Sequence, residues 1–239
     1  MEARRYLVRR PIWVVALALS LWASSAWAYW PDSRKIVHNS AFALEGGEKI
    51  LGIFTPLGYG INDWISVYIH PILLMLVTPN FNLRMTVYNR KVAIAVQLGY
   101  TESFLDFKSR RYPGIIEPGM RLSIPAGRYI VVNLGADYQL ELFPGAGDGP
   151  TVQHHVVVVA GLNAWIDRSN TISLNGNFSY NVSAKAFDIP TGTLLYAHGW
   201  ETFRLGVGVA FGRFLFQTSK DKFSKLYAYP VIDVWWRWF

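Results

Sequence analysis

The side chains of this sequence that could carry out chemistry are few, and they form no recognised catalytic motif. The chain has five histidines and no cysteine, and residues 29–239 contain no G-x-S-x-G, H-E-x-x-H, Walker or Rossmann pattern. His154 and His155 are adjacent, but neighbouring side chains on a strand point to opposite faces, so the two cannot bind one metal ion together. The sequence therefore predicts no metal and no cofactor.

One arrangement could suggest a serine hydrolase. His198 lies three residues before Glu201, and Ser179 lies on a neighbouring predicted strand. A hydrolase of this type uses the histidine to take a proton from the serine, while the acid orients the histidine. No spacing singles out these three residues, so we predict that the protein is not an enzyme. A lipid-modifying hydrolase or acyltransferase is kept as the weakest of three alternatives.

Residues 171–185 indicate which elements must position the polar side chains. Serine, threonine and asparagine alternate there with apolar residues and one glycine. A period of two is that of a β-strand with one polar and one apolar face. The same alternation recurs over 92–100, 129–143 and 203–211. The sequence therefore predicts an all-β fold of long antiparallel strands.

Residues 1–28 have the layout of a cleaved secretory signal peptide. A stretch with four arginines precedes a short apolar run, and small residues lie before and at Ala28. The apolar run is shorter than the roughly 20 residues that a transmembrane helix needs. We expect cleavage after Ala28 and an exported chain of residues 29–239. Its net charge falls from +7 to +4, because the signal peptide carries four arginines and one glutamate. This modest charge gives no basis for binding nucleic acid.

The apolar faces of the strands are predicted to point outward, to lipid. The exported chain has no disulfides to stabilise it, yet 51% of the whole sequence is hydrophobic and 15% is aromatic. A soluble β-sandwich would also show polar and apolar alternation. Long strands with aromatic residues near their ends instead favour an antiparallel up-and-down transmembrane β-barrel with two aromatic girdles.

The last residues, YAYPVIDVWWRWF, resemble the final strand of Gram-negative outer-membrane β-barrel proteins of the porin-like kind. In those proteins the last strand is amphipathic and ends in a phenylalanine that the barrel assembly machinery recognises. The resemblance implies location in the outer membrane, with its lipid and the assembly machinery as partners, and with Trp236, Trp238 and Phe239 as the assembly signal. Phe239 is out of phase with the two tryptophans, so either the strand ends at Trp238 or a bulge shifts the phase.

The number of strands follows from the lengths of the connections. Bacterial barrels have an even number of strands, with short periplasmic turns and longer external loops. This pattern favours twelve strands, at 40–44, 49–60, 64–75, 82–88, 92–100, 120–127, 129–143, 156–167, 171–182, 191–201, 203–214 and 227–239. An alternative of ten strands omits 40–44 and 193–199, but it places the tight turns outside and the long loops inside.

The polar faces would then line the lumen of the barrel. Twelve strands lie between the eight that side chains fill and the sixteen of an open porin, so we predict a narrow polar passage for small solutes. A closed structural or adhesive barrel is the second alternative, in which charges pair across the lumen. The predicted lumenal side chains are Arg84, Gln97, Asn133, Asp137, Gln139, Glu141, Asn175, Asn177, Asn181, Arg204, Asp233 and Arg237.

Overall fold

The computed structural model describes residues 39–102, 114–127, 129–143, 151–212 and 228–239. The predicted signal peptide, its cleavage site after Ala28 and the predicted lead-in from Tyr29 therefore lie outside the described residues. So do most of the residues predicted to form the longest external loops.

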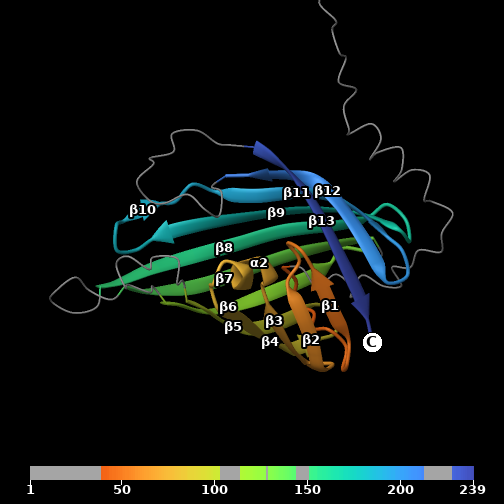
Figure 1. Cartoon of the computed structure of the whole chain (residues 1–239), viewed down its shortest axis with the longest axis horizontal. Coiled ribbons are helices and arrows are strands. Elements are labelled where there is room, and N and C mark those ends of the chain that lie inside the picture. The colour runs from red at the N-terminus through yellow and green to blue at the C-terminus, as the bar shows by residue number, and fades with distance from the viewer. Residues whose placement is uncertain (1–38, 103–113, 128, 144–150, 213–227) are drawn as a thin grey trace, which may run out of the picture.

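The described residues fold into one antiparallel sheet (Figure 1). Its strands are β1 (Lys49–Gly52), β2 (Leu57–Asn62), β3 (Ile65–Ile69), β4 (Asn80–Asn89), β5 (Ala93–Glu102), β6 (Gly114–Pro125), β7 (Ile130–Phe143), β8 (Thr151–Trp165), β9 (Asn170–Asn181), β10 (Ala186–Phe187), β11 (Thr191–Gly199), β12 (Phe203–Phe211) and β13 (Ala228–Trp238). One short helix, α2 (Pro71–Met75), lies between β3 and β4. None of the described helices is long and apolar enough to cross a membrane.

The sheet closes on itself through its first and last strands. In the pairing of β1 with β13, Lys49 lies opposite Trp238 and Gly52 lies opposite Trp235. The two-residue strand β10 pairs only with β9 and takes no part in the closure. The protein is therefore a closed up-and-down antiparallel β-barrel of twelve strands, which confirms the predicted fold class and the preferred number of strands.

Three of the predicted strands differ from the structure, although the total is right. The strand predicted at 64–75 is β3 only as far as Ile69, and Pro71–Met75 form the helix α2. The other two differences concern 40–44 and 49–60. Residues 40–44 form no strand. Residues 49–60, predicted as one strand, instead contain β1 and the start of β2, joined by residues 53–56. Asp233 accepts hydrogen bonds there from the Phe54 backbone N–H (2.9 Å) and the Thr55 hydroxyl (2.6 Å). Pro56 lacks the N–H that a continuous strand would need. The two errors cancel in the count.

The two ends of the barrel differ in the lengths of their connections. The turns at 63–64, 90–92, 126–129, 166–169 and 200–202 are all short and lie at one end, which we call the short-turn end. The opposite end, called here the long-loop end, carries the connection at 70–79 with α2 and the connection at 182–190 with β10. The predicted tight turns around 61–63, 89–91 and 168–170 thus all lie at the same end.

Neighbouring rows of paired residues show how the wall separates the two sides of the barrel. One row points outward and is apolar, with Leu174 50% exposed, and the adjacent row points inward and is polar or small, with Asn133 fully buried. The outward row contains Ile124, Val132, Leu162, Leu174, Leu194 and Val209, and the inward row contains Ser123, Asn133, Gly161, Asn175, Thr193 and Ala210. The alternation predicted from the sequence is therefore that of the two faces of a barrel wall.

Candidate functional site

The segment at 40–44 lies inside the barrel near the short-turn end, and we call it the inserted segment. Ser40, Ala41 and Leu44 are fully buried and Phe42 is 3% exposed. The segment packs in a hydrophobic cluster with inner-wall residues, among them Ala93, Ala95, Val131, Trp165, Ala197 and Trp235. Small alanines on the wall leave room for this extra piece of chain, so the lumen is filled at this end.

Three hydroxyl side chains of the wall fix the backbone of the inserted segment. The Ala41 N–H donates to Ser123 Oγ (2.8 Å), and the Leu44 N–H donates to Ser66 Oγ (2.7 Å). The Thr86 hydroxyl donates to the Ala41 carbonyl oxygen (2.7 Å). These hydroxyls come from β6, β3 and β4, so the segment is held across one side of the lumen. The bonds satisfy backbone groups that burial would otherwise leave without a partner.

An ion pair fixes the chain directly after the inserted segment. Glu48 and Arg237 are 3% and 7% exposed, and Arg237 donates through Nε to Glu48 Oε1 and through Nη2 to Oε2 (2.9 Å). Glu48 also accepts from the Glu45 N–H (3.0 Å). A Cβ atom at Gly60 would overlap the Glu45 carbonyl, so only glycine lets this turn pack against β2. The pair links the inserted segment to the closing strand β13.

A second buried ion pair lies further along the inner wall. Arg121 donates to both carboxylate oxygens of Asp137 (2.6 Å each), and Gln97 Nε2 donates to the same carboxylate (3.0 Å). In the register of β6 and β7, Asp137 lies opposite Gly119 and Arg121 lies opposite Gly135. A Cβ atom on Gly135 would come within 2.7 Å of the arginine side chain, so these glycines provide the space for the pair.

The predicted lumenal side chains differ in how deeply they are buried. Asn177 is exposed. Gln139, Glu141, Asn175 and Asn181 are partly buried. The remaining seven are buried, namely Arg84, Gln97, Asn133, Asp137, Arg204, Asp233 and Arg237. Several of these bond to one another or to other buried groups. Contact of these residues with a passing solute stays a prediction.

The predicted assembly residues lie at the end of β13 on the outer surface. Trp236, Trp238 and Phe239 are 40%, 37% and 67% exposed. The pairing of β13 with β1 and β12 has no shift in register, and the strand ends at Trp238. Of the two alternatives for the phase of Phe239, the end of the strand is therefore correct.

Sequence reasoning missed the partners of the predicted charges. Arg121 and Ser123 alternate with Met120 and Leu122, so the period of two could have identified them. Glu48 gave no such signal, because its role depends on a segment that folds into the lumen. The three hydroxyls that bond the inserted segment were missed for the same reason.

A cavity of about 400 Å³ lies in the half of the barrel nearer the long-loop end. Its lining includes Phe54, Tyr68, His70, Asn82, Arg84 and Glu117. Asn39, directly before the inserted segment, also contacts it. The cavity is therefore adjacent to the chain that fills the short-turn end.

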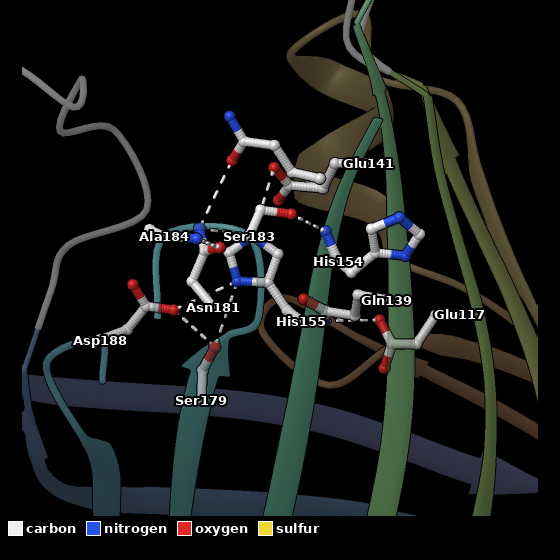
Figure 2. Close-up of polar contacts among 11 residues, drawn as sticks. Glu117, Gln139, Glu141, His154, His155, Ser179, Asn181, Ser183, Ala184 and Asp188 are labelled. Atoms are coloured by element: carbon white, nitrogen blue, oxygen red, sulfur yellow. Dashed lines mark hydrogen bonds and ion pairs between the residues drawn. The ribbon is translucent and has the colours of Figure 1, made fainter. Parts of the chain in front are cut away.

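A polar cluster near the long-loop end contains a serine, a histidine and an aspartate (Figure 2). Ser179 Oγ donates to Asp188 Oδ2 (2.5 Å), and His155 Nδ1 lies 3.3 Å from the same oxygen. His155 Nε2 lies 3.3 Å from Asn181 Nδ2 and 3.7 Å from Glu141 Oε2. Ser179 Oγ also lies 3.5 Å from His155 Nδ1, but its hydroxyl donates to the nearer Asp188 carboxylate. The serine proton is thus directed to the carboxylate rather than to the histidine, unlike in a catalytic triad.

The hydrolase arrangement considered from the sequence is not brought together. His198 is 2% exposed and its Nδ1 lies 2.8 Å from Asn170 Oδ1, at the short-turn end of β9. Ser179 lies near the other end of the same strand. The adjacent histidines do point to opposite faces, since His155 is in the cluster above and His154 Nδ1 lies 2.7 Å from the hydroxyl of the exposed Tyr138. Among the described residues, no group of three ligands could hold a metal ion.

Comparisons with models of known families, with curated proteins and with solved structures found no match to this chain.

We expect Ser66→Ala to increase the rate of amide hydrogen exchange at Leu44 by about tenfold. The substitution removes the acceptor of a buried N–H, and such a loss costs roughly 1–3 kcal/mol. Exchange of the refolded protein, measured by NMR, checks this. Ser123→Ala should act in the same way on Ala41, and the control Thr191→Val, near the long-loop end, should change neither amide. Unchanged exchange at Leu44 in Ser66→Ala would show that the hydroxyl does not hold the segment.

Proposed function

We propose that the protein is a β-barrel of the outer membrane of a Gram-negative bacterium and that its lumen takes up small polar solutes. The observation that carries the membrane part is the inverted distribution of its side chains. The outer wall exposes apolar residues throughout its middle, including Leu83, Leu98, Leu134, Val158, Leu174, Leu194 and Ile232. The buried positions inside hold charges, amides and hydroxyls. A barrel in water would have the opposite arrangement.

Exposed aromatic residues near both ends of the wall support the same proposal. Trp64, Tyr88, Tyr129, Trp236 and Trp238 lie near the short-turn end. Phe81, Tyr138 and Phe187 lie toward the long-loop end. Aromatic girdles of this type are found at the two membrane interfaces of outer-membrane barrels, with aliphatic residues between them. The partners proposed for this surface are outer-membrane lipid and, through Trp236, Trp238 and Phe239, the barrel assembly machinery.

The proposed location requires export and removal of the signal peptide. We expect the protein to fractionate with the outer membrane as a chain that begins at Tyr29, because residues 1–28 have the layout of a signal peptide. Mass spectrometry of the fractionated protein measures this. An intact N-terminus in the inner membrane would contradict both the cleavage and the location.

Three arginine substitutions on β9 compare its apolar face with its polar face. Leu174→Arg and Phe178→Arg, both on the apolar face near the middle of β9, should each lower the free energy of unfolding by roughly 2–4 kcal/mol, because a charge near the middle of the bilayer is costly. Asn177→Arg should have little effect, since this side chain is exposed but lies on the polar face. Reversible unfolding in lipid vesicles measures all three.

All three side chains are exposed, with Leu174 at 50% and Phe178 at 53%. Loss of burial inside the protein therefore cannot explain a difference between the two apolar positions and Asn177. Equal effects at all three positions would argue for a surface in water and against the membrane proposal.

For the lumen, we propose a solute path that is closed in the described conformation. The cavity of about 400 Å³ lies in the long-loop half, which the proposed orientation places outside the cell. The inserted segment fills the lumen between this cavity and the short-turn end. Passage of a solute would therefore require the segment to move. The hydrogen bonds with the three wall hydroxyls and the packing against small wall residues hold the inserted segment in the lumen. These contacts are weaker than a covalent link.

A permanently closed structural or adhesive barrel is the second candidate function. The buried pair of Glu48 with Arg237 favours it, because displacing the chain beyond residue 44 would expose or separate two buried charges. Arg121 and Asp137 likewise neutralise each other on the wall. The two candidates differ in whether the lumen can open.

Conductance in a planar bilayer separates the two candidates. We expect the refolded wild-type protein to show little or no steady conductance, because the inserted segment is closely packed. The combined variant Ser66→Ala, Thr86→Val, Ser123→Ala should open more often, since it removes the three wall hydroxyls that bond to the backbone of the segment.

The control for this experiment is Thr191→Val, which removes a hydroxyl of β11 distant from the segment. Circular dichroism verifies that each variant retains the β-structure of the wild type. A folded triple variant that stays closed would favour the structural barrel. A wild-type protein that is steadily open would contradict the proposed closure.

A further inference from the structure

The cavity in the long-loop half contains two buried polar atoms without a hydrogen-bond partner among the described residues, His70 Nδ1 and Asn82 Oδ1. The hydroxyl of Tyr68, which is 6% exposed and interacts with Ser66, lines the same cavity. Buried polar groups without partners are rare in native proteins, and a bound ligand is one way to satisfy them. The three polar groups therefore indicate a binding site.

The wall around Tyr68 is built to hold its ring in place. Tyr68 on β3 lies opposite Gly58 on β2, where a Cβ atom would come within 2.8 Å of the ring. The guanidinium of Arg84 lies 5.0 Å from the ring centroid on another side. Asn82 on β4 lies opposite Gly99 on β5 in the same way. Both side chains are thus positioned by the strands rather than by a loop.

Two hydrogen bonds between the His70 backbone and the Asn80 side chain hold His70 in place. Its N–H donates to Asn80 Oδ1 (2.6 Å), and Asn80 Nδ2 donates to its carbonyl oxygen (3.2 Å). Burial lowers the pKa of the His70 imidazole below its ordinary value. The charge of Asp233 and a hydrogen bond with the Phe54 backbone oppose this effect only in part. The imidazole is therefore neutral near pH 7, and a neutral imidazole has one nitrogen that accepts a hydrogen bond.

The charge balance of the lining indicates what kind of ligand the cavity takes. Arg84 and Glu117 are the charged residues in the described lining, one of each sign, so the lining has no excess of basic or of acidic residues. Asn82 Oδ1 and His70 Nδ1 are acceptors, so they bind O–H or N–H donors of a ligand. The Tyr68 hydroxyl can donate or accept a hydrogen bond. Apolar contacts come from Ile50, Phe54, Leu73 and Ile115.

We infer that this cavity binds a small neutral polyhydroxylated molecule, the chemistry of a mono- or disaccharide. Several hydroxyls on a compact ring bond to His70 Nδ1, Asn82 Oδ1 and the Tyr68 hydroxyl together, and the C–H faces of the ring lie against the apolar lining. A volume of about 400 Å³ is within the range of small-ligand sites. The inference names the solute class of the lumen, and to that extent it rests on the proposed uptake of solutes.

Calorimetric titration of the refolded protein in detergent micelles tests the inference. The probes are D-glucose and maltose, compared with L-alanine as a zwitterion and inorganic phosphate as an anion. We expect at least one of the sugars to bind, and neither L-alanine nor phosphate to bind as tightly. Binding in micelles is independent of membrane location and of conductance, so its failure is distinguishable from failure of the proposed function.

Matched variants identify the site. Asn82→Leu should weaken sugar binding at least tenfold, and Tyr68→Phe should weaken it severalfold, because it removes only the hydroxyl. The control is Asn175→Leu, since Asn175 also has a buried unpartnered Oδ1 but lines a different cavity. Absence of sugar binding, preference for L-alanine or phosphate, or equal weakening by Asn82→Leu and Asn175→Leu would each overturn the inference. Tyr68→Phe keeps the ring and its packing, so it decides the result if Asn82→Leu does not fold.

Discussion

The interior of this barrel has to be filled while remaining polar, and the rest of the structure depends on how that constraint is met. Closure of twelve strands leaves a space wider than the wall side chains alone would fill. Large inward side chains occupy part of it, and each needs room on the neighbouring strand. The register provides that room with glycines, which lie opposite Trp235, Tyr68, Asn82, Asp137, Arg121, Asn175, Arg204 and Asp233. The inserted segment fills most of the rest at the short-turn end.

Local alternation determined the fold class, because the period of two is a property of each strand by itself. The glycines within the polar phase, such as Gly206 and Gly208 opposite Asp233 and Leu195, appeared in the sequence only as small residues of one face. Their meaning as space for a partner depends on register, and register depends on which strands are neighbours. Period and composition can therefore predict a barrel without predicting its interior.

The errors in the strand assignment at 40–44 and 49–60 have the same physical origin. Residues 40–44 are mostly apolar and short, as a strand would be, but their backbone groups bond to wall hydroxyls rather than to another strand. The turn at 53–56 is stabilised by Asp233, which is far away in sequence. Both features are long-range, so neither leaves a local pattern. The same holds for the candidate site, because Tyr68, His70 and Asn82 come together only through the pairing of β2–β5 and the connection that carries α2.

The two halves of the lumen differ in how closely they are packed, and this difference bears on the side from which a solute would enter. Near the short-turn end the lumen is closely packed around the inserted segment, with Ala93, Val131 and Trp165 in contact with it. Toward the long-loop end a cavity remains, and polar side chains line part of it. A solute that approaches from the long-loop side would therefore meet hydrogen-bonding groups before it meets the closed part. From the other side it would first have to displace closely packed side chains, which is costly. The asymmetry favours entry from the long-loop end, and it makes the inserted segment, rather than the wall, the element that controls passage.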